Sequence, residues 1–252
     1  MNMTSAIFPS LARKTVVVTG GGSGIGAEIV RSFVAQKSRV FFLDIAEADS
    51  RALAEELGDA AQFIKCDLKD LAALKAALVS VEEKAGPVSV LVNNAANDDR
   101  HSFEDVTPAY WEDRINVNLR HYFFAAQALL PSMRRGGGGA IINIGSVSWH
   151  LALPDLVLYE TSKAAIEGLT RALARDLGEA NIRVTSVIPG AVKTPRQMAL
   201  WHTPEEEKKI VTQQCLKGRV EPSDVAAVVQ FLASDDARYC TAHSYWVDAG
   251  YR

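Results

Sequence analysis

Short runs of apolar residues, many of them β-branched or aromatic, alternate along the chain with longer stretches of mixed polarity. Residues 16–18 (VVV) and 40–43 (VFFL) are apolar throughout rather than at every second position. Strands covered on both faces show this pattern, as in a parallel sheet. We predict seven strands from such runs, at residues 14–19, 39–44, 62–66, 88–93, 140–146, 183–188 and 244–248.

Helical periodicity occupies most of the intervals between these strands. Within residues 165–177, apolar side chains recur about once per helical turn, at Ile166, Leu169, Leu173 and Leu177. Strands that alternate with helices imply right-handed crossovers and a doubly wound sheet. We therefore predict an α/β fold, a Rossmann-type parallel sheet of about seven strands with helices on both faces.

The 252 residues show no break in composition, so we expect one domain over 1–252. Residues 1–13 precede the first strand as an N-terminal extension. Residues 190–217 begin as a long irregular connection, and such segments often cover binding sites in compact domains. We expect a substrate lid there.

Charge and cysteine content limit the kinds of partner, metal site and cellular compartment that we expect for this protein. A net charge of −3 without a basic cluster argues against nucleic acid. The three cysteines, Cys66, Cys215 and Cys240, are widely spaced and form no CxxC motif, which indicates neither a disulfide framework nor a metal site. No apolar run approaches the ~20 residues that span a bilayer. Residues 1–13 lack a basic segment followed by a long apolar one, so we expect no secretory signal. These features favour the cytoplasm, with no membrane partner and no metal.

A glycine-rich turn, TGGGSGIG at residues 19–26, follows the first predicted strand and opens a helix from about Gly24 to Ala35. Glycines permit positive φ and let the backbone approach a pyrophosphate. The helix N-terminus adds free N–H groups and the positive end of its dipole. A flexible turn is the alternative, but the strand before and the helix after favour a dinucleotide site.

Asp44 ends the second predicted strand, 18 residues after Gly26. An acidic residue near this spacing accepts hydrogen bonds from the adenosine ribose hydroxyls and repels a 2′-phosphate. Asp44 therefore favours NAD over NADP. The alternative is a solvated aspartate at a strand end.

From residue 14 to 252 the chain resembles the short-chain dehydrogenase/reductase family. The glycine turn matches the family's TGxxxGxG pattern, and residues 93–96 (NNAA) resemble its NNAG segment. Ser146, Tyr159 and Lys163 match its Ser and YxxxK pattern, with 13 residues from Ser146 to Tyr159. Alanine replaces the family's glycine at positions 96, 242 and 249, which adds a methyl group each time and removes no reacting group.

The resemblance implies the residues of a cofactor site and of a catalytic site. The implied cofactor contacts are Gly20, Ser23, Gly24, Ile25, Gly26, Asp44, Asp67, Leu68, Asn94, Ala95, Tyr159, Lys163, Pro189, Val192 and Thr194. The implied catalytic residues are Asn118, Ser146, Tyr159 and Lys163. Ser146 would hold the reacting oxygen toward Tyr159, and Asn118 would hold a water that relays protons from Lys163. A buried helix asparagine bonded to backbone is the alternative for Asn118.

Of the six tyrosines, only Tyr159 has a lysine four residues later. Residues i and i+4 share one face of a helix, so the Lys163 ammonium can lie near the phenol. A nearby cation favours the phenolate and lowers the tyrosine pKa from its usual value of about 10. Tyr159 is then a plausible general base toward a substrate hydroxyl, while nicotinamide takes the hydride. The alternative is an exposed helix pair.

Residues 97–101 and 148–155, with 215–218 and 247–252, resemble bacterial aldose 1-dehydrogenases within the family. That resemblance implies NAD-dependent oxidation of the anomeric hydroxyl of a pentose or hexose, such as D-xylose, L-arabinose, D-galactose or L-fucose, to the aldonolactone. The expected substrate residues are Ser146, Trp149, His150, Tyr159, Gln197 and Trp201. The resemblance also implies a homotetramer.

Three alternatives stay open at this stage. Trp149 and Trp201 are as well explained as packing residues, and Asp98, Asp99 and Arg100 as a solvated or subunit-contact loop. The enzyme could be a carbonyl reductase or alcohol dehydrogenase for another small substrate. A non-catalytic NAD-binding protein of the same fold is a third hypothesis, since fold alone does not prove activity.

Overall fold

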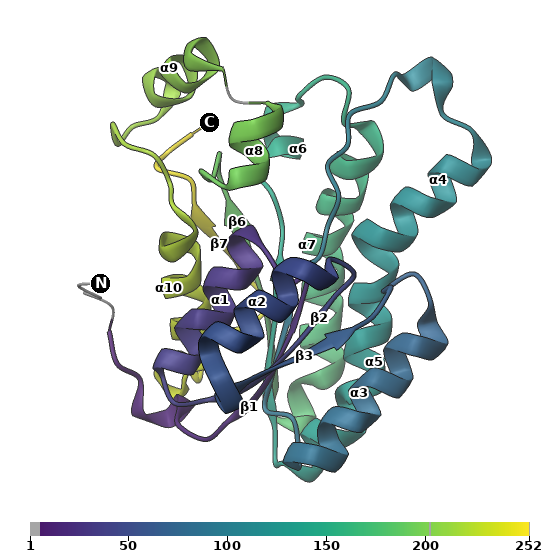
Figure 1. The fold of residues 1–252 in the computed structure, drawn as a ribbon, viewed down its shortest axis with the longest axis vertical. Helices are drawn as coiled ribbons and strands as arrows, with labels where there is room; N and C mark the ends of the chain where they lie inside the picture. Colours follow the sequence, from purple (N-terminus) through teal and green to yellow (C-terminus); the bar gives the residue numbers. More distant parts are fainter. Residues whose placement is uncertain (1–5, 202, 252) are drawn as a thin grey trace.

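One sheet of seven parallel strands forms the centre of the molecule (Figure 1). The structure is a computed structural model that describes residues 6–201 and 203–251. The strands are β1 (Thr15–Thr19), β2 (Arg39–Asp44), β3 (Ala61–Lys65), β4 (Val90–Asn93), β5 (Gly139–Ile144), β6 (Ile182–Pro189) and β7 (Ser244–Val247). The predicted strands and fold class are confirmed, with strand ends that differ by at most two residues.

Both faces of the sheet are buried, which explains why several strands are apolar throughout. Val17 in β1 belongs to the core on one face, and Val16 and Val18 belong to the core on the other. The helices on the two faces supply the rest of each core. One face is covered by α1 (Gly24–Ala35), α2 (Glu47–Leu57) and α10 (Pro222–Ala233), and the other by α3 (Leu71–Ala85), α5 (His121–Arg135) and α7 (Val157–Leu177).

The strand order is β3-β2-β1-β4-β5-β6-β7, so the chain reverses its direction of progress between β1 and β4. In open α/β sheets, ligands bind beyond the carboxyl ends of the strands at such a switch point. Shorter helices lie at this end of the molecule, as Figure 1 shows. They are α4 (Pro108–Ile115), α6 (Ser148–Leu151), α8 (Pro195–Leu200) and α9 (Pro204–Gln213).

The predicted N-terminal extension and the predicted lid both contain packed or helical structure in the described residues. The described part of the N-terminal extension packs on the domain, because Leu11 is fully buried and the Phe8 ring lies 6.4 Å from that of Phe231. Residues 1–5 of the extension lie outside the described residues. The segment 190–217 contains α8 and α9 rather than a continuous irregular loop.

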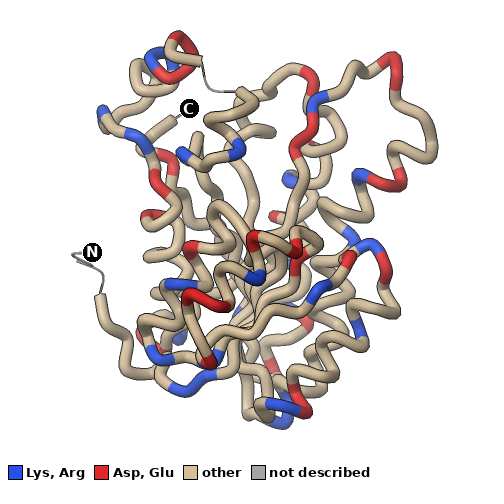
Figure 2. Tube along the Cα trace, viewed as in Figure 1, with Lys and Arg blue, Asp and Glu red and all other residues tan. Residues whose placement is uncertain are grey.

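Charges of both signs are interspersed along the trace (Figure 2), in line with the net charge of −3. Over residues 6–201 and 203–251, no helix has both the length and the apolarity needed to cross a bilayer.

Candidate active site

A cavity of about 850 Å³ opens at the carboxyl ends of β1, β2, β4, β5 and β6. Every predicted cofactor residue lines it, together with Ser146, Gln197 and Trp201. The described lining residues do not include Asn118, Trp149 or His150. The structure therefore brings most of the predicted site together in one place and separates three residues from it.

The glycine turn forms a tight cradle at the mouth of α1. Gly20 and Gly24 have φ values of +65° and +53°, a region that favours glycine. A Cβ at Gly26 would lie 1.8 Å from the carbonyl oxygen of Gly20, so the turn has no room for a side chain there. The Asn94 amide ties the turn to β4 by donating to Gly20 O at 2.8 Å. A turn held this closely, with its N–H groups at a helix start, fits a bound pyrophosphate.

Asp44 lines the cavity from the end of β2. Its carboxylate accepts the backbone N–H of Gly22 at 2.8 Å and that of Ala46 at 2.9 Å. These two bonds hold an anionic group at the position where the fold accepts an adenosine ribose. The remaining predicted cofactor residues border the same cavity from the segments after β3 and β4, from α7, and from the end of β6 and the segment after it.

Lys163 lies on α7 with only 1% of its surface exposed. Its ammonium donates to the Ile144 carbonyl at 2.8 Å and to the Tyr122 hydroxyl at 3.2 Å, and lies 5.5 Å from the centre of the Tyr159 ring. Burial lowers the pKa of Lys163 to about 7, while the nearby negative charge of Asp98 acts in the opposite direction. The expected proximity of Lys163 to Tyr159 is confirmed.

The expected direction of the Tyr159 pKa is wrong for the protein by itself. Burial raises this pKa above its ordinary value, and the negative charge of Asp98 raises it further. A hydrogen bond with Ser146 acts in the opposite direction. The reason is that desolvation disfavours the phenolate, while the Lys163 ammonium is bonded to Ile144 and Tyr122 instead.

Ser146 lies two residues beyond β5, on the wall of the cavity. Its hydroxyl donates to Ser148 Oγ at 2.9 Å and accepts the Ser148 N–H at 3.1 Å. These bonds direct its oxygen, and the hydrogen bond with Tyr159 shows that the two hydroxyls are adjacent.

Asn118 is fully buried in a π-helical turn, Asn116–Arg120. Its amide donates to the Asn97 carbonyl at 3.0 Å and accepts the Asn97 N–H at 2.8 Å. This is the alternative arrangement, an asparagine bonded to backbone, and it anchors the loop that follows β4. The water-holding role of Asn118 stays a prediction.

Trp149 and His150 correct the predicted substrate site. Both donate toward one carboxylate oxygen of Glu167 on α7, from Trp149 Nε1 at 2.9 Å and His150 Nε2 at 3.0 Å. The other Glu167 oxygen accepts Ser244 Oγ from β7 at 2.9 Å. The short helix α6 turns these two rings toward α7 and β7, away from the cavity, so we do not assign them to the substrate.

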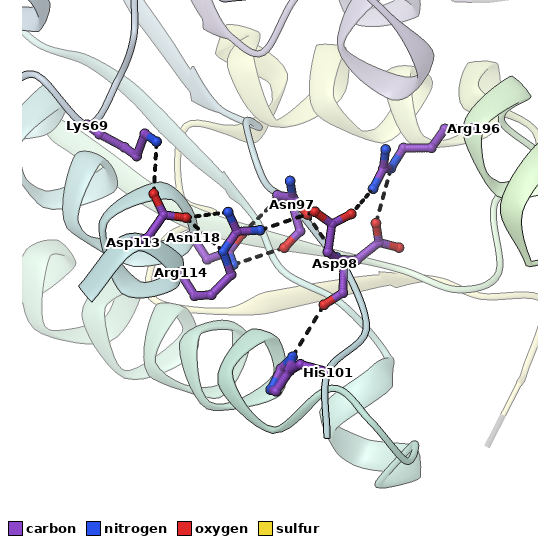
Figure 3. A network of polar contacts seen from close by, with 9 residues as sticks. Lys69, Asn97, Asp98, His101, Asp113, Arg114, Asn118 and Arg196 are labelled. Atoms are coloured by element: carbon purple, nitrogen blue, oxygen red, sulfur yellow. Dashed lines mark hydrogen bonds and ion pairs between the residues drawn. The ribbon is translucent and has the colours of Figure 1, made fainter. Parts of the chain in front are cut away.

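Gln197 and Trp201 line the cavity as expected, from α8 and the residue after it. Gln197 donates to Asp98 at 2.5 Å, and the Arg100 guanidinium lies 4.9 Å from the Trp201 ring centre. The loop after β4 thus contacts the predicted lid at several points, and Figure 3 shows the contact between Asp98 and Arg196.

Tyr122 is a site residue that sequence reasoning missed. It is fully buried, and its hydroxyl donates to the Ile144 carbonyl at 3.0 Å while accepting Lys163 Nζ. The sequence contains one indication of this role: Tyr122 lies four residues after Asn118, a spacing that places two residues on the same face of a helix.

The chain is similar in sequence to known proteins over nearly its whole length. A family model described as enoyl-(acyl carrier protein) reductase matches residues 20–252. D-xylose 1-dehydrogenase of Caulobacter vibrioides is 60% identical over 99% of this chain and 100% of that protein. A protein named "Probable galactose dehydrogenase GalD", from Rhizobium meliloti, is 45% identical over 99% of both chains.

A solved structure gives the same result. Ligand-free aldohexose dehydrogenase of Thermoplasma acidophilum superposes with a TM-score of 0.85 at 32% identity, over 97% of this chain and 96% of that one. Similarity of sequence and of fold thus extends over nearly the full length of the chain.

Proposed function

The chain belongs to the short-chain dehydrogenase/reductase family, and we propose that it oxidises the anomeric hydroxyl of an aldose to the aldonolactone with NAD. It is an oxidoreductase, and dehydrogenases of this family use NAD or NADP. One observation carries the proposal: Ser146, Tyr159 and Lys163 lie in the same cavity as the glycine cradle. The xylose and galactose dehydrogenases among its relatives support a sugar as substrate.

The chemistry divides between cofactor and protein. When bound, NAD would supply the acceptor for the hydride of the anomeric carbon and a positive charge in the cavity. Tyr159 removes the proton of the anomeric hydroxyl, and Ser146 donates a hydrogen bond to the same oxygen. Burial raises the pKa of Tyr159, so its phenolate requires positive charge nearby. The Lys163 ammonium, 5.5 Å from the Tyr159 ring centre, is the protein group placed to supply part of that charge.

The reaction is tested by following NADH formation with D-xylose, L-arabinose, D-galactose, L-fucose and D-glucose, with NAD and NADP in parallel. We expect turnover with at least one aldose and higher kcat/KM with NAD. Protein that binds NADH but oxidises no aldose would contradict the proposal and direct the search to other alcohols and ketones.

Replacing Asp44 by alanine is expected to raise the kcat/KM ratio of NADP to NAD about 10- to 100-fold. The carboxylate accepts ribose hydroxyls and repels a 2′-phosphate, so both effects are lost together. Steady-state kinetics with each coenzyme measures the ratio. The control is Asp49→Asn, which removes an exposed charge on α2 outside the cavity and is expected to leave the ratio unchanged.

Replacing Tyr122 by phenylalanine is expected to lower kcat about tenfold, with KM for both substrates within about twofold. The hydroxyl is one of the two acceptors that hold the Lys163 ammonium, so its loss misplaces the charge near Tyr159. Tyr239→Phe is the matched control, because Tyr239 is 90% exposed. An unchanged kcat in the Tyr122 variant would show that the Ile144 carbonyl suffices.

We also propose a cytoplasmic homotetramer whose segment 190–217 covers the substrate. The exposed apolar side chains of Trp111 and Phe123 on α4 and α5 support a subunit contact, and Gln197 and Trp201 in the cavity wall support the lid. Light scattering of the purified protein tests the tetramer.

A further inference from the structure

Asp98, on the loop after β4, carries a carboxylate into the same cavity as Tyr159. Its side chain is 21% exposed. One carboxylate oxygen accepts Gln197 Nε2 at 2.5 Å, and the other lies 3.3 Å from Arg196 Nε, both on α8. Its negative charge raises the pKa values of both Tyr159 and Lys163, which places it within electrostatic reach of the reacting groups.

The loop that carries Asp98 is anchored to the π-helical turn by hydrogen bonds. Asn118 fixes the preceding residue, Asn97, through both its backbone N–H and its carbonyl. The Asn97 side chain in turn accepts the Asp99 N–H at 2.8 Å. Figure 3 shows the contacts of Asn97 with Asn118 in the π-helical turn and the contact of Asp98 with Arg196. The backbone on both sides of Asp98 is therefore anchored, at Asn97 and at Asp99.

We propose that Asp98 determines specificity for polyhydroxylated substrates, by accepting hydrogen bonds from ring hydroxyls near the reacting carbon. This inference rests on the proposed function and names the residue that distinguishes a sugar from a simple alcohol. An ionised carboxylate is an acceptor with about four lone-pair sites, and Gln197 and Arg196 engage one on each oxygen. Hydroxyl donors complete the set with charge-assisted bonds. An alcohol without further hydroxyls leaves those sites unpaired, which costs affinity.

Asp99 offers a matched comparison for a purely structural ion pair. It is the next residue on the loop, with a side chain 50% exposed, and it pairs with Arg196 at 2.5 Å and Arg114 at 3.4 Å. Within residues 97–100 of this loop, Asn97, Asp98 and Arg100 line the cavity, and Asp99 does not. Asp99→Asn therefore weakens the same contact with α8 without removing an acceptor from the cavity.

Kinetics of the two variants on the best aldose separate these roles. Asp98→Asn is expected to raise KM for the sugar about 10- to 100-fold, the effect of losing a hydrogen bond to a charged group. KM for NAD is expected to stay within twofold. Asp99→Asn is expected to keep both KM values within twofold. An unchanged KM in Asp98→Asn, or an equal rise in both variants, would overturn the proposal.

The pH profile gives a second measurement. Tyr159 lies near Ser146, Lys163, Glu160 and Asp98, and among these the charges of Asp98 and Glu160 raise its pKa. Removing the Asp98 charge lowers the Tyr159 pKa, so the rising limb of kcat/KM against pH is expected to move to lower pH. The shift in Asp99→Asn is expected to be smaller. A limb that stays in place in Asp98→Asn would contradict the position assigned to this carboxylate.

Wild-type protein with monodeoxy sugars gives a test that needs no variant. Removing the one hydroxyl that Asp98 accepts is expected to lower kcat/KM about 10- to 100-fold, and Asp98→Asn is expected to lose little more on that analogue. If every monodeoxy analogue stays within twofold of the parent sugar, this proposal fails while the proposed function stands. If wild-type protein oxidises no aldose, the proposed function fails, and this proposal with it.

Discussion

Replacing Tyr159 by phenylalanine is expected to lower kcat at least about a thousandfold, with NADH affinity within about twofold of the wild type. Positioned general bases contribute about 10²- to 10⁴-fold, and the phenylalanine ring keeps the packing while removing the only atom that takes the proton. The Lys163 ammonium is held by the Ile144 carbonyl and the Tyr122 hydroxyl. Stopped-flow or steady-state NADH formation measures kcat, and fluorescence titration measures NADH binding.

Two other results of the Tyr159→Phe experiment would contradict this role of Tyr159. A Tyr159→Phe protein with full turnover would exclude this residue as the base and would overturn the mechanism. Loss of NADH binding together with turnover would instead assign Tyr159 to the cofactor alone. Tyr239→Phe serves again as the control for an exposed tyrosine.

Replacing Gly26 by alanine is expected to abolish NADH binding at concentrations that saturate the wild type and to destabilise the fold by about 1–3 kcal/mol. The new Cβ would lie 1.8 Å from the Gly20 carbonyl oxygen and 2.6 Å from the Asn94 amide nitrogen. Neither neighbour can move without opening the turn, since Asn94 itself ties Gly20 to β4. Calorimetry measures binding, and thermal unfolding measures stability.

Gly168→Ala is the matched control for that change. Gly168 lies on the exposed side of α7, and a Cβ there meets nothing within 4 Å. Alanine in a helix interior is favoured over glycine by about 1 kcal/mol, so this variant is expected to gain stability and to bind NADH normally. Normal binding by Gly26→Ala would remove the glycine turn from the cofactor site.

The effects expected for the Tyr159 and Gly26 variants are larger than those expected for the Asp98 and Tyr122 variants. We expect a nearly complete loss of turnover when Tyr159 is replaced, and of NADH binding when Gly26 is replaced, because no neighbouring group takes over either role. Tyr122 shares its role with the Ile144 carbonyl, and Asp98 affects substrate affinity rather than the transfer itself. Effects of about tenfold in the second group would still be measurable against their controls.

Local sequence features determined the fold and the centre of the site. Strands buried on both faces are apolar throughout, so runs such as Val16 to Val18 identify them without knowledge of their neighbours. The glycine turn depends on a few adjacent backbone conformations. The Tyr159–Lys163 pair depends on one helical turn. All three are set within a few residues, and the structure places each as its pattern predicts.

Only the tertiary structure decided where the remaining side chains point and how they titrate. Trp149 and His150 turn from the cavity because Glu167 on α7 binds them both. The Asp98 carboxylate accepts a hydrogen bond from Gln197, which lies 99 residues away in the chain. The pKa of Tyr159 is raised because a whole set of elements excludes water from it. The orientation and the desolvation of a side chain depend on contacts with residues that are distant in the sequence. A local sequence pattern does not predict those contacts.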